Sequence, residues 1–98
     1  MSFGLSDQAL LLIKQAIKQF PEIKKAVIFG SRAMGNYQNG SDVDLAIFGE
    51  EINHKIENRL SSILNEELPL PYFFDVVDYT HLSHQKLAAH IKRFGKPI

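Results

Sequence analysis

The sequence predicts a single α/β domain in which three or more short strands form a small sheet with helices on at least one face. Segments with apolar residues every three or four positions alternate with short β-branched runs, and glycine or proline separates them. The chain has 98 residues, which fits one compact domain. No internal repeat or linker divides it, so we expect residues 1–98 to form one unit.

The composition is ordinary for a globular domain and excludes several classes of function. Hydrophobic residues make up 45% and charged residues 22%, and the absence of cysteine excludes disulfides and thiolate metal sites. Eleven basic and eleven acidic side chains cancel, which disfavours direct nucleic-acid binding but leaves a local basic patch open. With no apolar leader and no run near the ~20 residues of a membrane span, we expect a soluble, cytoplasmic protein.

Apolar residues that recur every three or four positions predict three helices, at residues 6–20, 51–65 and 83–94. Ser6 suits the N-cap of the first helix, and Asp7 places a negative charge in its first turn. Pro21 ends this helix, and Gly95 is expected to cap the last one. The final letters, FGKPI, are interpreted as a tail.

Short apolar runs predict three strands, at residues 25–29, 42–48 and 72–79. The stretch from Gly30 to Gly40 predicts a loop, with one helical turn starting at Ser31. In the second strand, the period of two places Asp42 and Asp44 on the same face as its last aromatic residue. The aliphatic side chains between them point to the other face, toward the predicted core.

Asp42 and Asp44 lie close enough to repel each other. Their backbone positions are roughly 6.6 Å apart, and two carboxylates about 4 Å apart repel by roughly 4 kcal/mol at an effective dielectric near 20. Solvent, a shared proton, a basic partner or a metal ion has to compensate. Asp75, in the apolar third strand, can join them if the two strands are neighbours, and three carboxylates suit Mg²⁺. The alternative is that Asp42 caps a turn and Asp44 faces water.

The Gly30–Ser31 pair follows directly after a buried strand. Glycine lets the backbone approach a ligand closely, and the free amides at the start of a helix bind anions. Arg32 is expected either to make a bidentate phosphate contact or to pair with an acidic side chain at the surface. We therefore predict a phosphate site at this loop, opposite a metal site at the carboxylates.

The spacing of these motifs resembles the signature of the DNA polymerase beta-like nucleotidyltransferase superfamily. Gly30-Ser31 is followed by ten residues and then by Asp42-x-Asp44. The segments GSRAMG, SDVDLAIF and FDVVDY resemble the smallest members, the minimal nucleotidyltransferase (MNT) domains, and the resemblance spans nearly the whole chain. It implies a mixed sheet and the transfer of a nucleoside monophosphate from a nucleoside triphosphate to a hydroxyl, with release of pyrophosphate.

The resemblance also implies roles for the candidate residues. Asp42 and Asp44 would bind two Mg²⁺ ions, and Asp75 would complete the metal site and help to deprotonate the acceptor. The implied nucleotide-binding residues are Gly30, Ser31 and Arg32. These roles agree with a two-metal mechanism, in which the protein mainly positions and neutralises charge.

Minimal domains of this kind resemble the antitoxins of two-gene toxin–antitoxin pairs. The resemblance implies transfer of AMP from ATP to a tyrosine of a helical HEPN toxin. A different possibility is a binding module that neutralises its partner by complex formation alone. A third is a transferase for a small-molecule hydroxyl, which the lack of an added acceptor-recognition domain disfavours.

Two positions complicate the family pattern. Many relatives carry a second basic residue where this chain has Met34, which is expected to weaken the triphosphate contact. Asp78 is the alternative third carboxylate, but Asp75 is preferred because it lies inside the apolar run. No carboxylates lie at a helical spacing that would complete a zinc site, so surface or capping roles are expected for the four histidines: His54, His81, His84 and His90.

Overall fold

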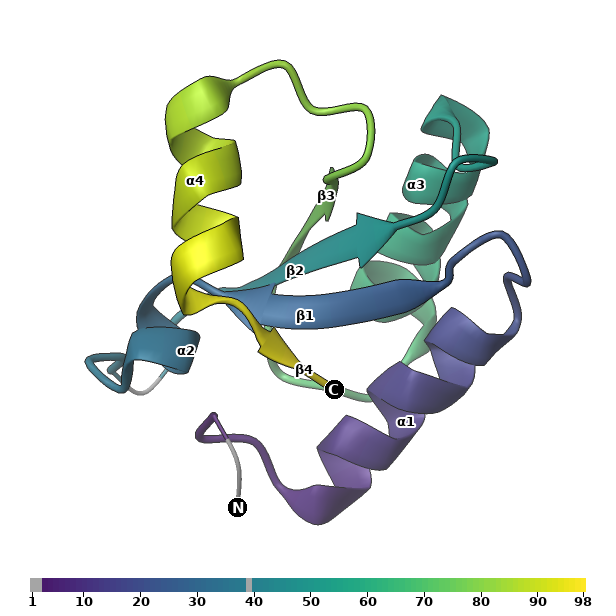
Figure 1. Ribbon diagram of the computed structural model, residues 1–98. Coiled ribbons are helices and arrows are strands. Elements are labelled where there is room, and N and C mark those ends of the chain that lie inside the picture. Colours follow the sequence, from purple (N-terminus) through teal and green to yellow (C-terminus); the bar gives the residue numbers. More distant parts are fainter. Residues whose placement is uncertain (1–2, 39) are drawn as a thin grey trace.

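The computed structural model describes residues 3–38 and 40–98 (Figure 1). Its strands form one sheet in the order β3-β2-β1-β4. β1 pairs antiparallel with β2 and β4, whereas β2 and β3 are parallel. The predicted α/β class with a small mixed sheet is therefore confirmed. The strands are β1 (Lys25–Phe29), β2 (Val43–Phe48), β3 (Phe74–Asp78) and β4 (Lys96–Pro97).

The helices differ from the predicted ranges mainly at their ends. In the first helix, Ser6 Oγ accepts a hydrogen bond from the Ala9 N–H at 3.1 Å, as the predicted N-cap requires. In the helix predicted at residues 51–65, Asn53 Oδ1 accepts from the Ile56 N–H at 3.0 Å, so this helix begins at His54, later than expected. No helix of the described residues is both long and apolar enough to cross a membrane. The helices are α1 (Asp7–Lys18), α2 (Ser31–Met34), α3 (His54–Ser62), the π-helix η1 (Ile63–Glu67) and α4 (Gln85–Phe94).

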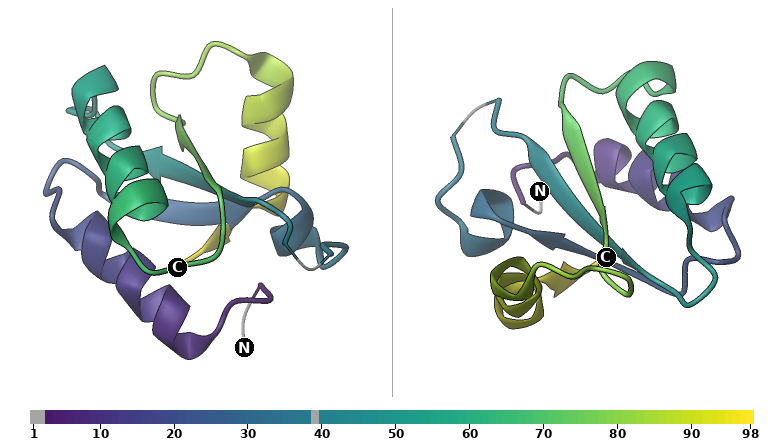
Figure 2. Two further views of the ribbon diagram at one scale, coloured as in Figure 1. Left: turned by 180° about the vertical axis from the view of Figure 1, so that it is seen from behind. Right: turned by 90° about the horizontal axis from the view of Figure 1, so that it is seen from above.

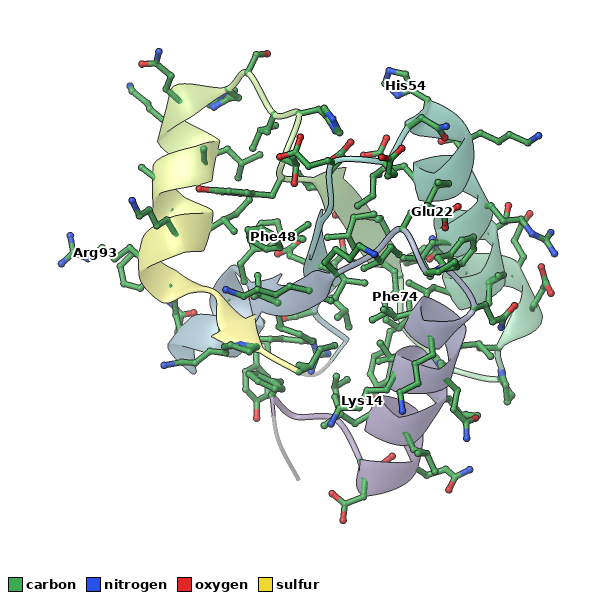
Figure 3. All side chains as sticks on the ribbon, turned by 45° about the vertical axis from the view of Figure 1, so that its right-hand side comes forward. Lys14, Glu22, Phe48, His54, Phe74 and Arg93 are labelled. Carbon is green, nitrogen blue, oxygen red and sulfur yellow. The ribbon has the colours of Figure 1, made fainter. Side chains whose placement is uncertain are left out.

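Helices cover both faces of the sheet (Figure 2). One face carries the larger core, in which Leu45 and Phe74 pack with buried residues of α1, α3 and η1. The other face carries Ala46, which packs with Ile91 of α4. Figure 3 labels Phe74, which belongs to the larger core, and Phe48, which packs against the smaller one. The predicted alternation of β2 is confirmed, and the face that bears Asp44 is the one that α4 covers.

The interpretation of the last residues as a tail was wrong, because they form β4. Ile28 of β1 pairs with Lys96, and the Ile98 N–H donates to the Ala26 carbonyl at 3.2 Å. Gly95 is the C-cap of α4, but its backbone is extended (φ −62°, ψ 136°), which directs the chain into β4. A Cβ at Gly95 would lie 2.5 Å from the Ile91 carbonyl oxygen and 2.9 Å from Cγ2 of Val27, so a side chain there would clash with α4 and β1.

Candidate active site

Asp44 and Asp75 are register partners in the parallel pair β2–β3. Register partners on neighbouring strands point to the same face of the sheet, here the face covered by α4. Asp42 lies two residues before Asp44, just outside β2, and continues the same alternation. The structure thus places all three candidate carboxylates on one side of the sheet, at the end where β2 and β3 begin.

The charges of these carboxylates act on one another. The pKa of Asp44 is raised, first by burial and then by the negative charges of Asp75 and Asp42. The positive charge of protonated His90 acts in the opposite direction. The site therefore concentrates negative charge that the protein compensates only in part, and a cation would relieve the remaining repulsion.

Gly30 lies against the Asp44 carboxylate at the end of β1. Its backbone (φ 73°, ψ −153°) belongs to a region that residues with a side chain rarely adopt. A Cβ at this position would overlap the carboxylate oxygen Oδ2 and lie 3.1 Å from Cγ of Asp44. Only glycine fits here, because the backbone has a positive φ and the Asp44 carboxylate leaves no room for a side chain. The Gly30 backbone thus borders the carboxylate site.

Ser31 opens the short helix α2 directly after this glycine. The Met34 N–H donates to the Gly30 carbonyl at 3.1 Å, so helical hydrogen bonding begins at the motif, as predicted. The first amides of a helix have no partner within the helix. The structure therefore places the first amides of α2, at Ser31, directly after the glycine that lies against Asp44.

Arg32 is buried, with 3% of its surface exposed, and it does not project into the site. Its guanidinium donates to the Ser41 carbonyl from Nε (3.1 Å) and Nη2 (2.8 Å), and to the Phe3 carbonyl from Nη1 (2.8 Å). It also lies over the rings of Tyr37 and Tyr72, at 5.1 and 5.0 Å from their centroids. These contacts hold the residue immediately before Asp42, so here Arg32 supports the loop rather than exposing its donors to a phosphate.

Asp78 lies on the opposite face from Asp75, as expected for residues three apart in a strand. Its Oδ2 lies 2.7 Å from Nδ1 of His81, and its backbone N–H donates to Oε2 of Glu57 at 3.0 Å. A groove of about 530 Å³ between α3 and the segment leading into α4 is lined by Asp78, Glu57 and His81, among others. This groove lies apart from the three carboxylates, and the geometry favours Asp75 over Asp78 as the third member.

The surface or capping role predicted for His90 was wrong, because its side chain is half-buried and acts on the charge of Asp44. His90 lies on α4, and its ring meets that of Phe29 edge to face with centroids 6.1 Å apart. Phe29 is the register partner of Asp44, which explains why His90 acts on the pKa of that aspartate. His84, the N-cap of α4, has the predicted capping role, because its Nδ1 accepts from the Leu87 N–H at 3.1 Å.

The donor set suits Mg²⁺ in its chemistry but does not form a complete cage. Within residues 3–38 and 40–98, no three His, Cys, Asp or Glu side chains are grouped closely enough to hold a metal ion by themselves. Mg²⁺ is commonly held by one or two carboxylates together with substrate phosphates and water. Hard oxygen donors with uncompensated charge therefore fit a cation that binds together with a nucleotide.

Curated proteins include a relative with a named activity. Protein adenylyltransferase MntA of Aphanizomenon flos-aquae (strain 2012/KM1/D3) is 35% identical over 92 residues. The alignment covers 84% of this chain and 60% of that protein. The chain thus spans about three fifths of the length of this relative.

Solved structures with the same fold include toxin–antitoxin complexes. A toxin–antitoxin crystal structure with AMP-PNP matches with a TM-score of 0.73 at 21% identity, over 95% of this chain and 72% of that chain. A complex of a tri-AMPylated Shewanella oneidensis HEPN toxin with its MNT antitoxin matches with a TM-score of 0.64 at 21% identity, over 91% and 70% of the two chains. At these identities the likeness shows a shared fold.

The family model described as "Polymerase beta, Nucleotidyltransferase" matches residues 12–98. This match includes the Gly30–Ser31 pair, Asp42, β2 with Asp44, and β3. The four-strand mixed sheet with flanking helices is the fold that this family has. The chain therefore belongs to the polymerase beta nucleotidyltransferase family.

Proposed function

We propose that this chain is a Mg²⁺-dependent adenylyltransferase that moves AMP from ATP to a tyrosine hydroxyl of a HEPN-type toxin and thereby acts as an antitoxin. The observation that carries the proposal is that Asp44 and Asp75 are register partners on neighbouring strands and that Gly30 lies against the Asp44 carboxylate. Family membership supports nucleotidyl transfer. The name of the cyanobacterial relative and the AMPylated HEPN toxin in a complex of the same fold support the acceptor class.

In this proposal, Asp42 and Asp44 hold Mg²⁺, and Asp75 completes the site. The bound cation would neutralise the phosphate charge and so favour displacement at the α-phosphorus. The amides at Gly30 and Ser31 bind the phosphates, where the dipole of the short helix and its free N–H groups favour negative charge. Arg32 acts indirectly, because it holds the Ser41 carbonyl and so fixes the approach to Asp42.

The proposed reaction is a single in-line displacement. The acceptor oxygen forms a bond to the α-phosphorus, and the bond from that phosphorus to the β-phosphate oxygen breaks to release pyrophosphate. The hydroxyl proton passes to Asp75, which is exposed and returns it to solvent. Burial and the negative charges of Asp75 and Asp42 raise the pKa of Asp44, and bound Mg²⁺ would favour the ionised form.

A second candidate is neutralisation of the partner by binding alone. It is favoured by the absence, across the described residues, of a preassembled metal group. Metal dependence separates the two, because a vestigial site would bind ATP equally well with Mg²⁺ and with EDTA. We expect ATP affinity to rise with Mg²⁺ in the wild type and not in Asp44→Asn.

The acceptor is tested directly by mass spectrometry. The protein is mixed with ATP, Mg²⁺ and the helical protein encoded by the neighbouring gene, and the partner is weighed intact and after digestion. The proposal expects one or more AMP additions on tyrosine with the wild type and none with Asp44→Asn. An unchanged partner mass with wild-type protein would contradict AMP transfer to this partner. Labelled ATP screened against small hydroxyl compounds then separates a small-molecule transferase from neutralisation by binding alone.

A further inference from the structure

Asn65 lies in the π-helical segment that follows α3. The Leu68 N–H donates to the Ile63 carbonyl at 3.0 Å, five residues back, which is the hydrogen bond of a π-helix. Such segments insert one residue into a helical turn and often occur at functional sites. Here the irregular turn carries Asn65 to the open edge of the sheet.

The side-chain amide of Asn65 binds both polar backbone groups of Phe74. Its Oδ1 accepts from the Phe74 N–H at 2.8 Å, and its Nδ2 donates to the Phe74 carbonyl at 3.1 Å. The same Nδ2 also donates to the carbonyl and hydroxyl of Ser61, at 3.0 and 3.2 Å. Both ends of the amide are thus used, and its orientation is determined by three backbone groups.

This contact takes the place of a neighbouring strand. β3 is the edge strand of the sheet, and on its inner side the Val43 N–H donates to the Phe73 carbonyl at 2.8 Å. The backbone groups of Phe74 point outward, where an edge strand has no ladder partner. Asn65 therefore bonds the outward backbone groups of Phe74, next to the residue, Phe73, that β2 bonds on the inward side of the strand.

The clamp acts on the peptide unit that leads into Asp75. The Phe74 carbonyl and the Asp75 N–H belong to one planar peptide group, so a bond to that carbonyl fixes the plane from which Asp75 projects. The ring of Phe74 is buried in the core on the other face of the sheet. Asp75 itself is exposed, so burial of its own side chain does not hold it in place.

We propose that Asn65 is a positioning residue that holds Asp75 opposite Asp44. The proposal rests on the proposed function, which gives Asp75 its part in catalysis. If Asn65 only protected the sheet edge, every side chain that bonds an outward backbone group of β3 would have the same effect on the site when removed. Glu57 offers the comparison, because its Oε2 accepts from the Asp78 N–H at 3.0 Å on the same edge but at the far end of the strand.

The test compares Asn65→Ala with Glu57→Ala, each of which removes one cap from the same strand. Amide hydrogen exchange followed by NMR reports on the backbone at residues 74 and 75, and Mn²⁺ titration in the presence of AMP-PNP reports on the metal site. For Asn65→Ala we expect exchange at Phe74 at least tenfold faster and Mn²⁺ affinity at least fivefold weaker. Glu57→Ala is expected to leave both at wild-type values.

The transfer reaction adds a kinetic readout. With the helical partner as acceptor, Asn65→Ala is expected to lower kcat at least tenfold while KM for ATP stays within twofold, because Gly30 and Ser31 are untouched. Asn65→Asp keeps the acceptor for the Phe74 N–H but places a carboxylate oxygen against the Phe74 carbonyl. We expect kcat of Asn65→Asp to lie between those of the wild type and Asn65→Ala. If Asn65→Ala does not fold, Asn65→Asp replaces it in the test.

The outcomes separate the two proposals. If the wild type transfers no AMP, the proposed function fails, and the exchange and Mn²⁺ measurements still decide whether Asn65 positions Asp75. Wild-type exchange and Mn²⁺ affinity in Asn65→Ala would overturn the clamp. Equal losses in Asn65→Ala and Glu57→Ala would also overturn it, because they would show that Asn65 only protects the edge.

Discussion

Gly30 and Asp44 are in contact across the β1–β2 pair, and the backbone of the glycine leaves no room for a side chain above the carboxylate. This contact joins the expected phosphate loop to the expected metal ligands. It explains why a glycine follows a buried strand directly and why the aspartate lies at the start of the next one. Substitution at either residue should therefore disturb both halves of the site.

Gly30→Ala should abolish AMP transfer and destabilise the fold. The positive φ alone costs about 1–3 kcal/mol in a residue with a side chain, and the methyl group would also displace the Asp44 carboxylate. Urea denaturation and the mass-spectrometric transfer assay measure the two effects. Gly35→Ala is the matched control, because its φ is +83° and a Cβ there meets nothing within 4 Å. Full activity in Gly30→Ala would show that the contact is dispensable.

Asp75→Asn should lower the rate of AMP transfer by about 10²–10⁴-fold, the range expected for loss of a general base. The control is Asp78→Asn, a substitution of the same type in the same strand but on the opposite face, where an amide can still bond His81. We expect Asp78→Asn to retain activity within about threefold, since an altered surface side chain away from the site has little effect. The reverse order of activities would assign the third carboxylate to Asp78.

Asp44→Asn should stabilise the fold at neutral pH even though it removes activity. The pKa of Asp44 is raised by folding, so the native state binds the proton more tightly than the unfolded state, and stability falls as pH rises through the native pKa. Removing the charge relieves this cost, by less than about 1 kcal/mol because solvent screens the group in part.

The check is thermal unfolding of the wild type and Asp44→Asn across pH, in EDTA. The difference in Tm should be present at neutral pH and should disappear below pH 3.8, the ordinary pKa of an aspartate, because Asp44 is then protonated in both the folded and the unfolded state. A variant less stable than the wild type at neutral pH would show that the Asp44 charge is already compensated within the protein.

Arg32→Lys should destabilise the fold by about 1–3 kcal/mol, because a lysine cannot replace the planar fork that bonds the Phe3 and Ser41 carbonyls together. Arg59→Lys is the control: Arg59 pairs with Glu67 at 3.7 Å with both side chains exposed, so its loss should cost about 0–1 kcal/mol. Chemical denaturation measures both. If Arg32→Lys is as stable as the wild type and only KM for ATP rises, Arg32 is a phosphate ligand rather than a support.

Local patterns were sufficient for most of the fold. The β-branched run at Lys25–Phe29 is a strand with the predicted bounds, and the alternation in β2 places Asp44 on the predicted face. β4 was missed because it has only two residues, one of them a proline, and its pairing with β1 depends on tertiary contact. The π-helical turn likewise leaves no periodic signal in the sequence.

The positions of site residues could be predicted where local strand and turn geometry determines them. Spacing brings Asp42, Asp44 and Gly30 together, because one strand, one turn and the next strand fix their geometry. The burial of Arg32 depends on two tyrosines, one of which lies forty residues further along the chain, and the approach of His90 depends on how α4 packs. Such contacts between distant segments are set by the whole fold.

The most direct test of the site is anomalous diffraction from crystals of the protein grown with AMP-PNP and Mn²⁺. We expect manganese peaks about 2.1 Å from carboxylate oxygens of Asp42 and Asp44, with Asp75 on the same ion and the triphosphate along Gly30 and Ser31. Manganese bound elsewhere, such as in the groove lined by Glu57, Asp78 and His81, or Asp75 turned away from the ion, would contradict the account.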